Sequence, residues 1–160
     1  MRSTFLLLLI TFSIFLKAQP AKEYPKDYFS APLDIPLVLA GSFGELRTNH
    51  FHSGIDIKTE QREGLPVYAP ADGVVSRIKI GVYGFGKALY INHPNGYTTV
   101  YAHLSRFNDK IEEYIRKEQY RKKTYEVEIF PSASAFAFNK GDIIAYTGNT
   151  GGSGGPHLHF

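Results

Sequence analysis

Short runs of β-branched and aromatic residues recur along most of this 160-residue chain, and Gly, Pro, Asp or Asn separates each run from the next. Such runs are typical of β-strands joined by turns. The clearest case is KALYINH-PNG-YTTVYAHL, where two alternating runs flank Asn95 and Gly96, a dipeptide that suits a tight hairpin turn. The others are PLVLAG, GIDIK, LPVYAPADG, GVVSRIKI and GDIIAYTG. The sequence therefore predicts a mostly β domain containing this hairpin.

One segment breaks the β pattern. In NDKIEEYIRKEQYRKK, residues 108–123, the apolar residues Ile111 and Ile115 recur at helical spacing. We expect Asp109 to cap this helix, and we interpret its basic end as a solvated face. The alternation of TYEVEIF then indicates a strand. Residues 106–138 are therefore predicted to be an inserted helix and strand.

The first residues have the pattern of a secretory signal. Arg2 precedes an apolar run from Phe5 to Leu16, and Ala18 offers a small residue for cleavage, so residues 1–18 are predicted to be a signal peptide. The run is shorter than the ~20 residues that span a membrane, which leaves a short uncleaved anchor as the lesser alternative. We expect an exported protein of the periplasm, cell envelope or extracellular space, with no membrane span after cleavage.

Residues 19–35 contain three prolines and little periodicity, which predicts an extended leader before a domain at 36–160. Removal of Arg2 and Lys17 with the signal leaves 16 of the 18 basic residues against 15 acidic ones. Because phosphate binding needs a concentrated basic face, we expect no nucleic-acid partner. There is no cysteine, so neither a disulfide nor a lipid-attachment thiol is available.

Two groups of side chains are candidate metal ligands: His50, His52 and Asp56 in NHFHSGIDI, and His157 and His159 in PHLHF. Histidines at i and i+2 of a strand project from one face, with Cα atoms ~6–7 Å apart. One can bind a metal while the other carries protons on the same side. Three nitrogen and carboxylate ligands with one open position are typical of a catalytic zinc site, whereas a closed structural site usually contains thiolates.

Histidine is the natural proton carrier here, because the HExxH signature with its glutamate base is absent. In a strand with a period of two residues, His103 would project from the same face as Tyr97 and Tyr101. Taken alone, this position favours the interpretation that His103 is a packed strand residue without a catalytic role. His93 lies beside the turn, where exposed polar residues are common, and we assign it no role. His50 lacks a carboxylate four residues further on.

Five segments in order resemble the zinc-dependent M23 peptidases, the lysostaphin and LytM type of peptidoglycan endopeptidase: FGELRTNHFHSGIDI, GLPVYAPADGVV, YGFGKALYINHPNGYTTVYAHLS, NKGDIIAYTGNTG and SGGPHLHF. The resemblance covers roughly residues 41–160 and implies an antiparallel β sandwich with a groove over one Zn²⁺. It implies the metal ligands His52, Asp56 and His159 and the catalytic histidines His103 and His157. Of these two, we expect His157 to be the base and His103 to be the oxyanion donor.

The resemblance implies a secreted zinc metalloendopeptidase that hydrolyses peptide cross-links of bacterial peptidoglycan. The alternative is a noncatalytic LytM-like regulator of cell-wall amidases, but members of that kind usually lack some metal ligands. A carrier module, suggested by APADGVV and NKGDII, has no need of these histidines.

Three further expectations concern the edges of the site. Residues 106–138 are longer than the usual connection in the family, and we expect them to wall one side of the groove. The chain stops at Phe160, where relatives commonly continue, which indicates truncation at the C-terminus. The glycine run from Gly148 is expected to be a loop passing close to the groove, with Pro156 setting the entry into the last strand.

Overall fold

Eleven strands and one helix make up residues 26–160, the part of the chain that the computed structural model describes. The predicted signal peptide, 1–18, and the start of the predicted leader lie outside the described residues. The strands are β1 (Leu39–Gly41), β2 (Asp56–Lys58), β3 (Pro66–Tyr68), β4 (Gly73–Ile80), β5 (Lys87–Asn92), β6 (Thr98–Tyr101), β7 (Arg106–Phe107), β8 (Val127–Ile129), β9 (Ala137–Phe138), β10 (Ile143–Tyr146) and β11 (His157–His159), and the helix is α2 (Asp109–Lys122). The predicted mostly β class with one inserted helix is confirmed.

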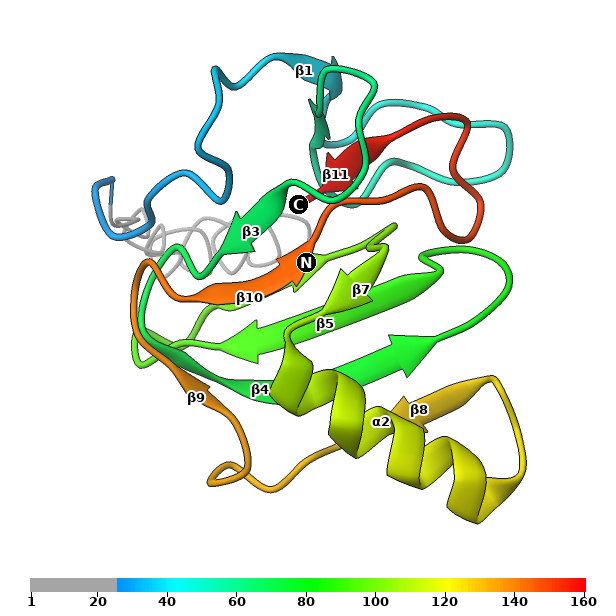
Figure 1. Cartoon of the computed structure of the whole chain (residues 1–160). Coiled ribbons are helices and arrows are strands. Elements are labelled where there is room, and N and C mark those ends of the chain that lie inside the picture. Colours follow the sequence, from blue (N-terminus) through cyan, green and yellow to red (C-terminus); the bar gives the residue numbers. More distant parts are fainter. Residues whose placement is uncertain (1–25) are drawn as a thin grey trace, which may run out of the picture.

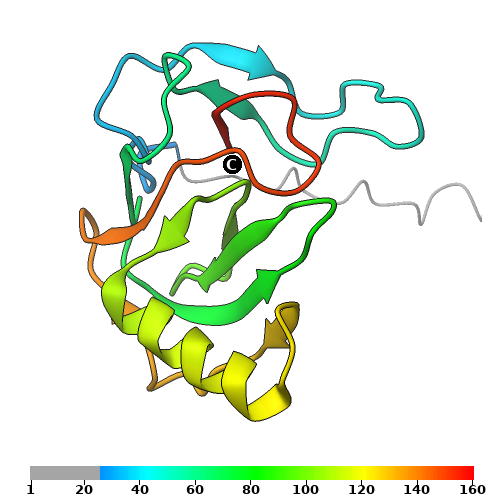
Figure 2. The same ribbon diagram turned by 45° about the vertical axis from the view of Figure 1, so that its right-hand side comes forward.

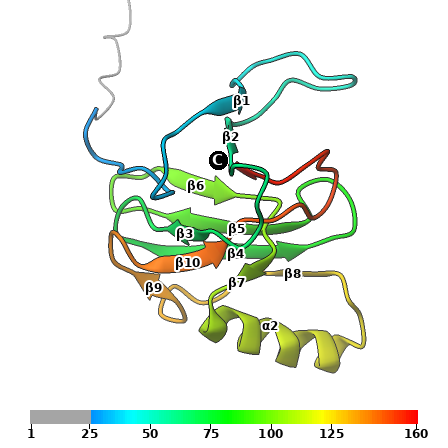
Figure 3. The same ribbon diagram turned by 45° about the horizontal axis from the view of Figure 1, so that its top comes forward.

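The strands form three sheets in which all pairings are antiparallel. The largest has the order β6-β5-β4-β8, with β9 also paired to β4, and the two smaller sheets are β3-β10-β7 and β1-β2-β11. The β1-β2-β11 sheet lies at one end of the molecule and α2 at the opposite end (Figures 1 and 3).

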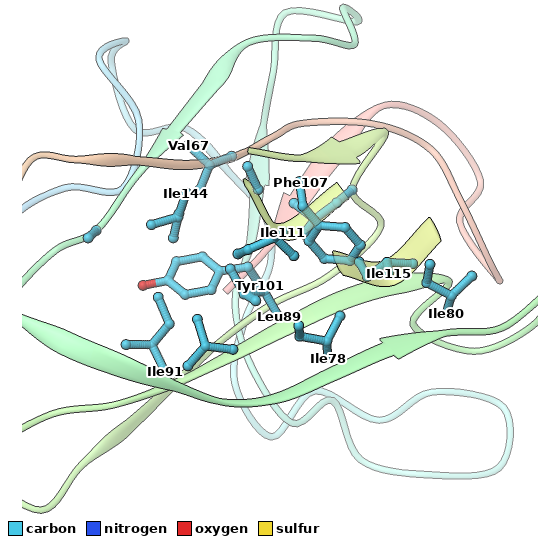
Figure 4. Close-up of a cluster of buried hydrophobic side chains, with 14 of the residues drawn as sticks. Val67, Ile78, Ile80, Leu89, Ile91, Tyr101, Phe107, Ile111, Ile115 and Ile144 are labelled. Atoms are coloured by element: carbon cyan, nitrogen blue, oxygen red, sulfur yellow. The ribbon is translucent and has the colours of Figure 1, made fainter. Parts of the chain in front are cut away.

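The hydrophobic core lies between the largest sheet and β3-β10-β7 (Figure 4). Ile78, Leu89 and Ile91 project from one side, Val67 and Ile144 from the other, and all are fully buried. Burial of each such side chain contributes about 1.5–3 kcal/mol to folding. The core is thus the contact that holds the two sheets face to face.

The predicted hairpin is confirmed. Strands β5 and β6 pair antiparallel in the register Asn92↔Thr98, and Gly96 in the turn has φ +84°. This conformation favours glycine, because a Cβ would be strained there.

His93, at the start of that turn, is buried rather than exposed, so the expectation drawn from its position is wrong. Its Nδ1 donates to the carbonyl oxygen of Asp72 (2.8 Å), and its Nε2 accepts from the hydroxyl of Thr99 (2.8 Å). Phe29 packs edge-on against the ring. Satisfied ring nitrogens and aromatic cover explain why this histidine lies in the interior.

The helix begins one residue earlier than the predicted cap implied. The side chain of Asn108 accepts from the backbone amide of Ile111 (3.1 Å), so Asn108 rather than Asp109 is the N-cap. Asn108 has extended backbone geometry, with φ −66° and ψ 162°, whereas Asp109 is already helical and accepts from Arg106 (2.8 Å). Asn108 can cap the helix and Asp109 cannot, because a capping side chain must belong to the residue before the first helical residue.

The segment 106–138 builds the core and does not wall the groove. Ile111 and Ile115 of α2 are buried beside Phe107, while β8 and β9 extend the largest sheet beside β4. Figure 2 shows α2 at the end remote from the glycine loop of residues 148–156. None of residues 106–138 lines the cavity beside His103 and His157, so the expectation of a groove wall is wrong. The apolar stripe of the helix packs on the sheets instead. Within residues 26–160, no helix is both long and apolar enough to cross a bilayer.

Candidate metal centre

Two of the candidate ligands are brought together by strand pairing. Strands β2 and β11 are antiparallel neighbours in which His159 lies directly opposite Asp56. The amides of Ile55 and Phe160 each donate to the other's carbonyl oxygen at 2.8 Å, which secures this register. Directly opposite residues have Cβ atoms only ~4.5–5.5 Å apart, so the two side chains meet.

The third candidate, His52, comes from a short hairpin that spans residues 45–52. The hairpin is closed by the bridge between Leu46 and Phe51 and by a hydrogen bond from the His52 amide to the Glu45 carbonyl oxygen (2.8 Å). The Nδ1 of His52 lies 2.9 Å from the carbonyl oxygen of Ser42, which can only accept, so Nδ1 carries the hydrogen. In a neutral ring the lone pair of His52 is then on Nε2, which lies 3.0 Å from Asp56 Oδ1.

The three ligand atoms form a nearly equilateral triangle. The separation is 3.0 Å between His52 Nε2 and Asp56 Oδ1, 3.0 Å between His52 Nε2 and His159 Nδ1, and 3.1 Å between His159 Nδ1 and Asp56 Oδ1. All three residues are buried. Zinc bonds of ~2.0–2.2 Å at tetrahedral angles place ligand atoms ~3.3 Å apart, so this group is able to hold the ion.

Protonation favours metal binding as well. When the ring of His52 is neutral, its Nε2 and Asp56 Oδ1 are two acceptor atoms 3.0 Å apart, an arrangement that a cation stabilises. Burial lowers the pKa of His159 from 6.5 to about 4, so its ring is neutral near pH 7. Burial alone would raise the pKa of Asp56, but the electrostatic influence of His157, His52 and His159 and a hydrogen bond from His159 lower it. Neutral histidines and a charged carboxylate are the forms that metals bind.

Two further histidines lie beside this group. The ring centroids of His103 and His157 are 4.7 Å apart, and Nε2 of His157 lies 3.4 Å from Asp56 Oδ1. His103 follows the end of β6 and has φ +58°, so the strand alternation does not reach it. The interpretation of His103 as a packed strand residue is therefore not supported.

The glycine-rich loop determines which nitrogen of each histidine is available. The Nδ1 of His103 donates to the carbonyl oxygen of Thr150 (2.8 Å), and the Nδ1 of His157 donates to that of Gly155 (2.8 Å). In a neutral ring, Nε2 then carries the lone pair. Both side chains thus offer Nε2 for proton transfer. Burial also lowers the pKa of His103, which favours its neutral form.

Close backbone contacts explain two of the glycines in this loop. A Cβ on Gly148 would overlap the amide nitrogen of Ser105, and one on Gly151 would overlap that of Gly86. Gly151 also has φ +74°. The expected close passage is confirmed, because Gly152, next along the loop, lines the same cavity as the histidines.

The site opens into a cavity of about 420 Å³. It is lined by parts of the 45–52 hairpin, by Gly84 and Phe85, by the glycine loop and by the five histidine and aspartate residues of the site. His50 also lines the cavity, but its Nδ1 is engaged by Asn49 Oδ1 (2.7 Å) and it lies outside the ligand triangle.

Sequence reasoning missed Arg47, which lines the cavity and donates from Nη2 to Asp56 Oδ2 (2.9 Å). Its position in FGELRTNHFH is the only signal, since it is a basic residue close to a predicted ligand. Phe85 was also missed, and its ring packs against His159 with centroids 4.8 Å apart.

Comparisons with known proteins point to one family. The sequence matches the model of Peptidase family M23 over residues 50–120. It is 36% identical over 115 residues to the DD-carboxypeptidase/endopeptidase Mpg of Neisseria meningitidis, covering 72% of this chain and 20% of that protein. It is 28% identical over 148 residues to the peptidoglycan DD-endopeptidase ShyC of Vibrio cholerae, covering 89% of this chain and 28% of that protein.

The fold agrees with these matches. A crystal structure of a zinc-containing peptidase from Vibrio cholerae superposes with a TM-score of 0.59 and 27% identity, over 82% of this chain and 35% of that one. This chain spans only part of the length of the relatives that it matches, 20% of Mpg and 28% of ShyC.

Proposed function

Because this chain belongs to peptidase family M23, we propose that it is a zinc metalloendopeptidase, exported to the bacterial cell envelope, that hydrolyses peptide cross-links of peptidoglycan. The observation that carries the proposal is the ligand triangle of His52, Asp56 and His159 with two further histidines presenting Nε2 beside it. The relative ShyC, which is named as a peptidoglycan DD-endopeptidase, supports the choice of substrate.

The three ligand atoms would hold one zinc ion through His52 Nε2, Asp56 Oδ1 and His159 Nδ1. Bound zinc supplies a Lewis acid that polarises a peptide carbonyl and lowers the pKa of a water molecule. The protein contributes the arrangement around it, because the Ser42 carbonyl orients the ring of His52 and the β2–β11 register orients the other two ligands.

Proton transfer falls to His157 and His103. We assign the base role to His157, whose Nε2 lies 3.4 Å from the ligand oxygen of Asp56 and so faces the centre of the site. His103, whose ring centroid lies 4.7 Å from that of His157, would support the developing oxyanion of the substrate carbonyl. The carbonyls of Thr150 and Gly155 keep both rings in a fixed orientation while this occurs.

The decisive experiment uses purified zinc-loaded protein and purified peptidoglycan, with the released peptides identified by mass spectrometry. Cleavage of cross-links that disappears with a chelator, returns with zinc and is lost in His157→Ala supports the proposal. His50→Ala is the matched control, since it changes a cavity histidine that contacts none of the ligands. A zinc-loaded wild type that cuts no wall type would favour the regulator of cell-wall amidases instead.

A further inference from the structure

The two carboxylate oxygens of Asp56 have separate partners. Oδ1 faces the ligand nitrogens of His52 and His159, at 3.0 and 3.1 Å. Oδ2 points the other way and accepts a hydrogen bond from Arg47 Nη2 at 2.9 Å. The Asp56 side chain is only 10% exposed, so its carboxylate is largely shielded from water.

The backbone makes room for this ion pair. Strand β1 places Gly41 opposite Asp56 in the sheet. A Cβ at position 41 would overlap Arg47 Nη2 and lie 2.6 Å from Asp56 Oδ2. Any residue larger than glycine would therefore displace the guanidinium, the carboxylate or both.

Arg47 is itself anchored on the hairpin that carries His52. Its amide donates to the carbonyl oxygen of His50 (2.9 Å), and its guanidinium also contacts the exposed carboxylate of Glu45 at 3.3 Å. The hairpin therefore delivers both a candidate ligand and the partner of a second candidate ligand.

We propose that Arg47 is a positioning residue of the metal centre, which holds Oδ2 of Asp56 so that only Oδ1 is offered to the ion. This inference rests on the zinc site of the proposed function. A charge-assisted hydrogen bond is well suited to the task, because it is roughly twice as strong as one between neutral groups. Without it, the carboxylate is free to rotate or to bind through both oxygens, which fills the position that a catalytic zinc leaves open.

The test measures zinc affinity by competition with a chelating dye. Loss of a group that orients a metal ligand typically costs ~10–100-fold in affinity, and we expect this loss for Arg47→Ala. Arg47→Lys should recover part of it, since the ammonium keeps the charge but not the planar donor geometry. Arg62→Ala is the matched control, because Arg62 pairs with the exposed Glu60 and should leave affinity unchanged.

A second variant keeps the arginine. Gly41→Ala introduces only a methyl group beside the ion pair and should weaken zinc binding in the same direction. In Co²⁺-substituted protein, both Arg47→Ala and Gly41→Ala should show weaker visible absorption, as expected if the second oxygen raises the coordination number.

Zinc affinity within about twofold of the wild type in both Arg47→Ala and Gly41→Ala would overturn the inference while leaving the proposed function intact. If Arg47→Ala fails to fold, an unchanged zinc affinity in Gly41→Ala is sufficient to overturn the inference. A wild-type chain that binds no zinc would overturn the proposed function and this inference with it.

Discussion

Asp56 and His159 are cross-strand partners whose Oδ1 and Nδ1 atoms lie 3.1 Å apart, although 103 residues separate them in the sequence. A slip of one residue between β2 and β11 would turn His159 to the opposite face of the sheet. The candidate metal centre therefore depends on the register of one short strand pair. That register is itself held by the packing of Ile57 and Leu158, both fully buried.

The first prediction concerns metal content. The wild type should carry about one zinc per chain after dialysis. His52→Ala and Asp56→Ala should each lose most of it, because removal of one of three ligands leaves the ion with two. Elemental analysis checks this result, and His50→Ala should keep its zinc. Full zinc content in both ligand variants would contradict the assignment.

The second prediction separates ligands from proton carriers. His157→Ala and His103→Ala should keep zinc and lose ~10²–10⁴ in kcat, the usual contribution of general acid–base catalysis. Turnover of a cross-bridge peptide is measured with zinc content determined in parallel. Near-normal turnover in both zinc-loaded variants would contradict the histidine mechanism.

The pH profile of kcat/KM then tests which histidine is the base. If His157 takes the proton, the fall in rate on the acidic side should persist in the residual activity of His103→Ala and disappear in that of His157→Ala. The reverse pattern would assign the base to His103.

The third prediction concerns the glycine loop. Gly151→Ala should lower turnover and destabilise the fold by about 1–3 kcal/mol, because φ is +74° and the new Cβ would overlap the Gly86 backbone. The neighbouring Thr150 carbonyl would then no longer orient His103. Gly154→Ala is the control for stability, since a Cβ there contacts no other atom of the fold. Thermal unfolding and peptide turnover measure both effects, and equal behaviour of the two variants would contradict this account.

The fourth prediction concerns the inserted helix. Ile115→Ala should destabilise the protein by about 2–5 kcal/mol, because Ile115 is buried in the core. Tyr120→Ala, on the same helix but 79% exposed, should change stability by less than about 0.5 kcal/mol. Urea unfolding gives both values. A changed KM with unchanged stability in Ile115→Ala would instead connect the helix with substrate binding.

The fifth prediction concerns acid. In metal-free protein, burial lowers the pKa of His159 to about 4, below the 6.5 of an exposed histidine. Between these values the unfolded chain binds the proton and the folded chain does not, so stability should fall as pH decreases from 6.5 to about 4. His159→Gln should flatten this dependence in urea titrations at several pH values. An equally steep decline in the variant would show that other groups cause it.

The sequence by itself determined the elements whose signals are local. The Asn95-Gly96 turn, the helix after Asn108 and the paired histidines of PHLHF follow from spacings of a few residues, over which backbone geometry is regular. Likewise, the segment NHFHSGIDI indicated His52 and Asp56 as candidates by residue type and separation.

Tertiary structure alone decided the rest, because those contacts join segments far apart in the chain. Burial of His93 depends on Phe29, and the tautomers of His103 and His157 depend on carbonyls of a loop that no periodicity describes. The contact of Arg47 with Asp56 requires Gly41 to lie opposite Asp56 in another strand. The helix of residues 109–122 packs on the core because the sheets leave an apolar face there, and local spacing cannot show which face that is.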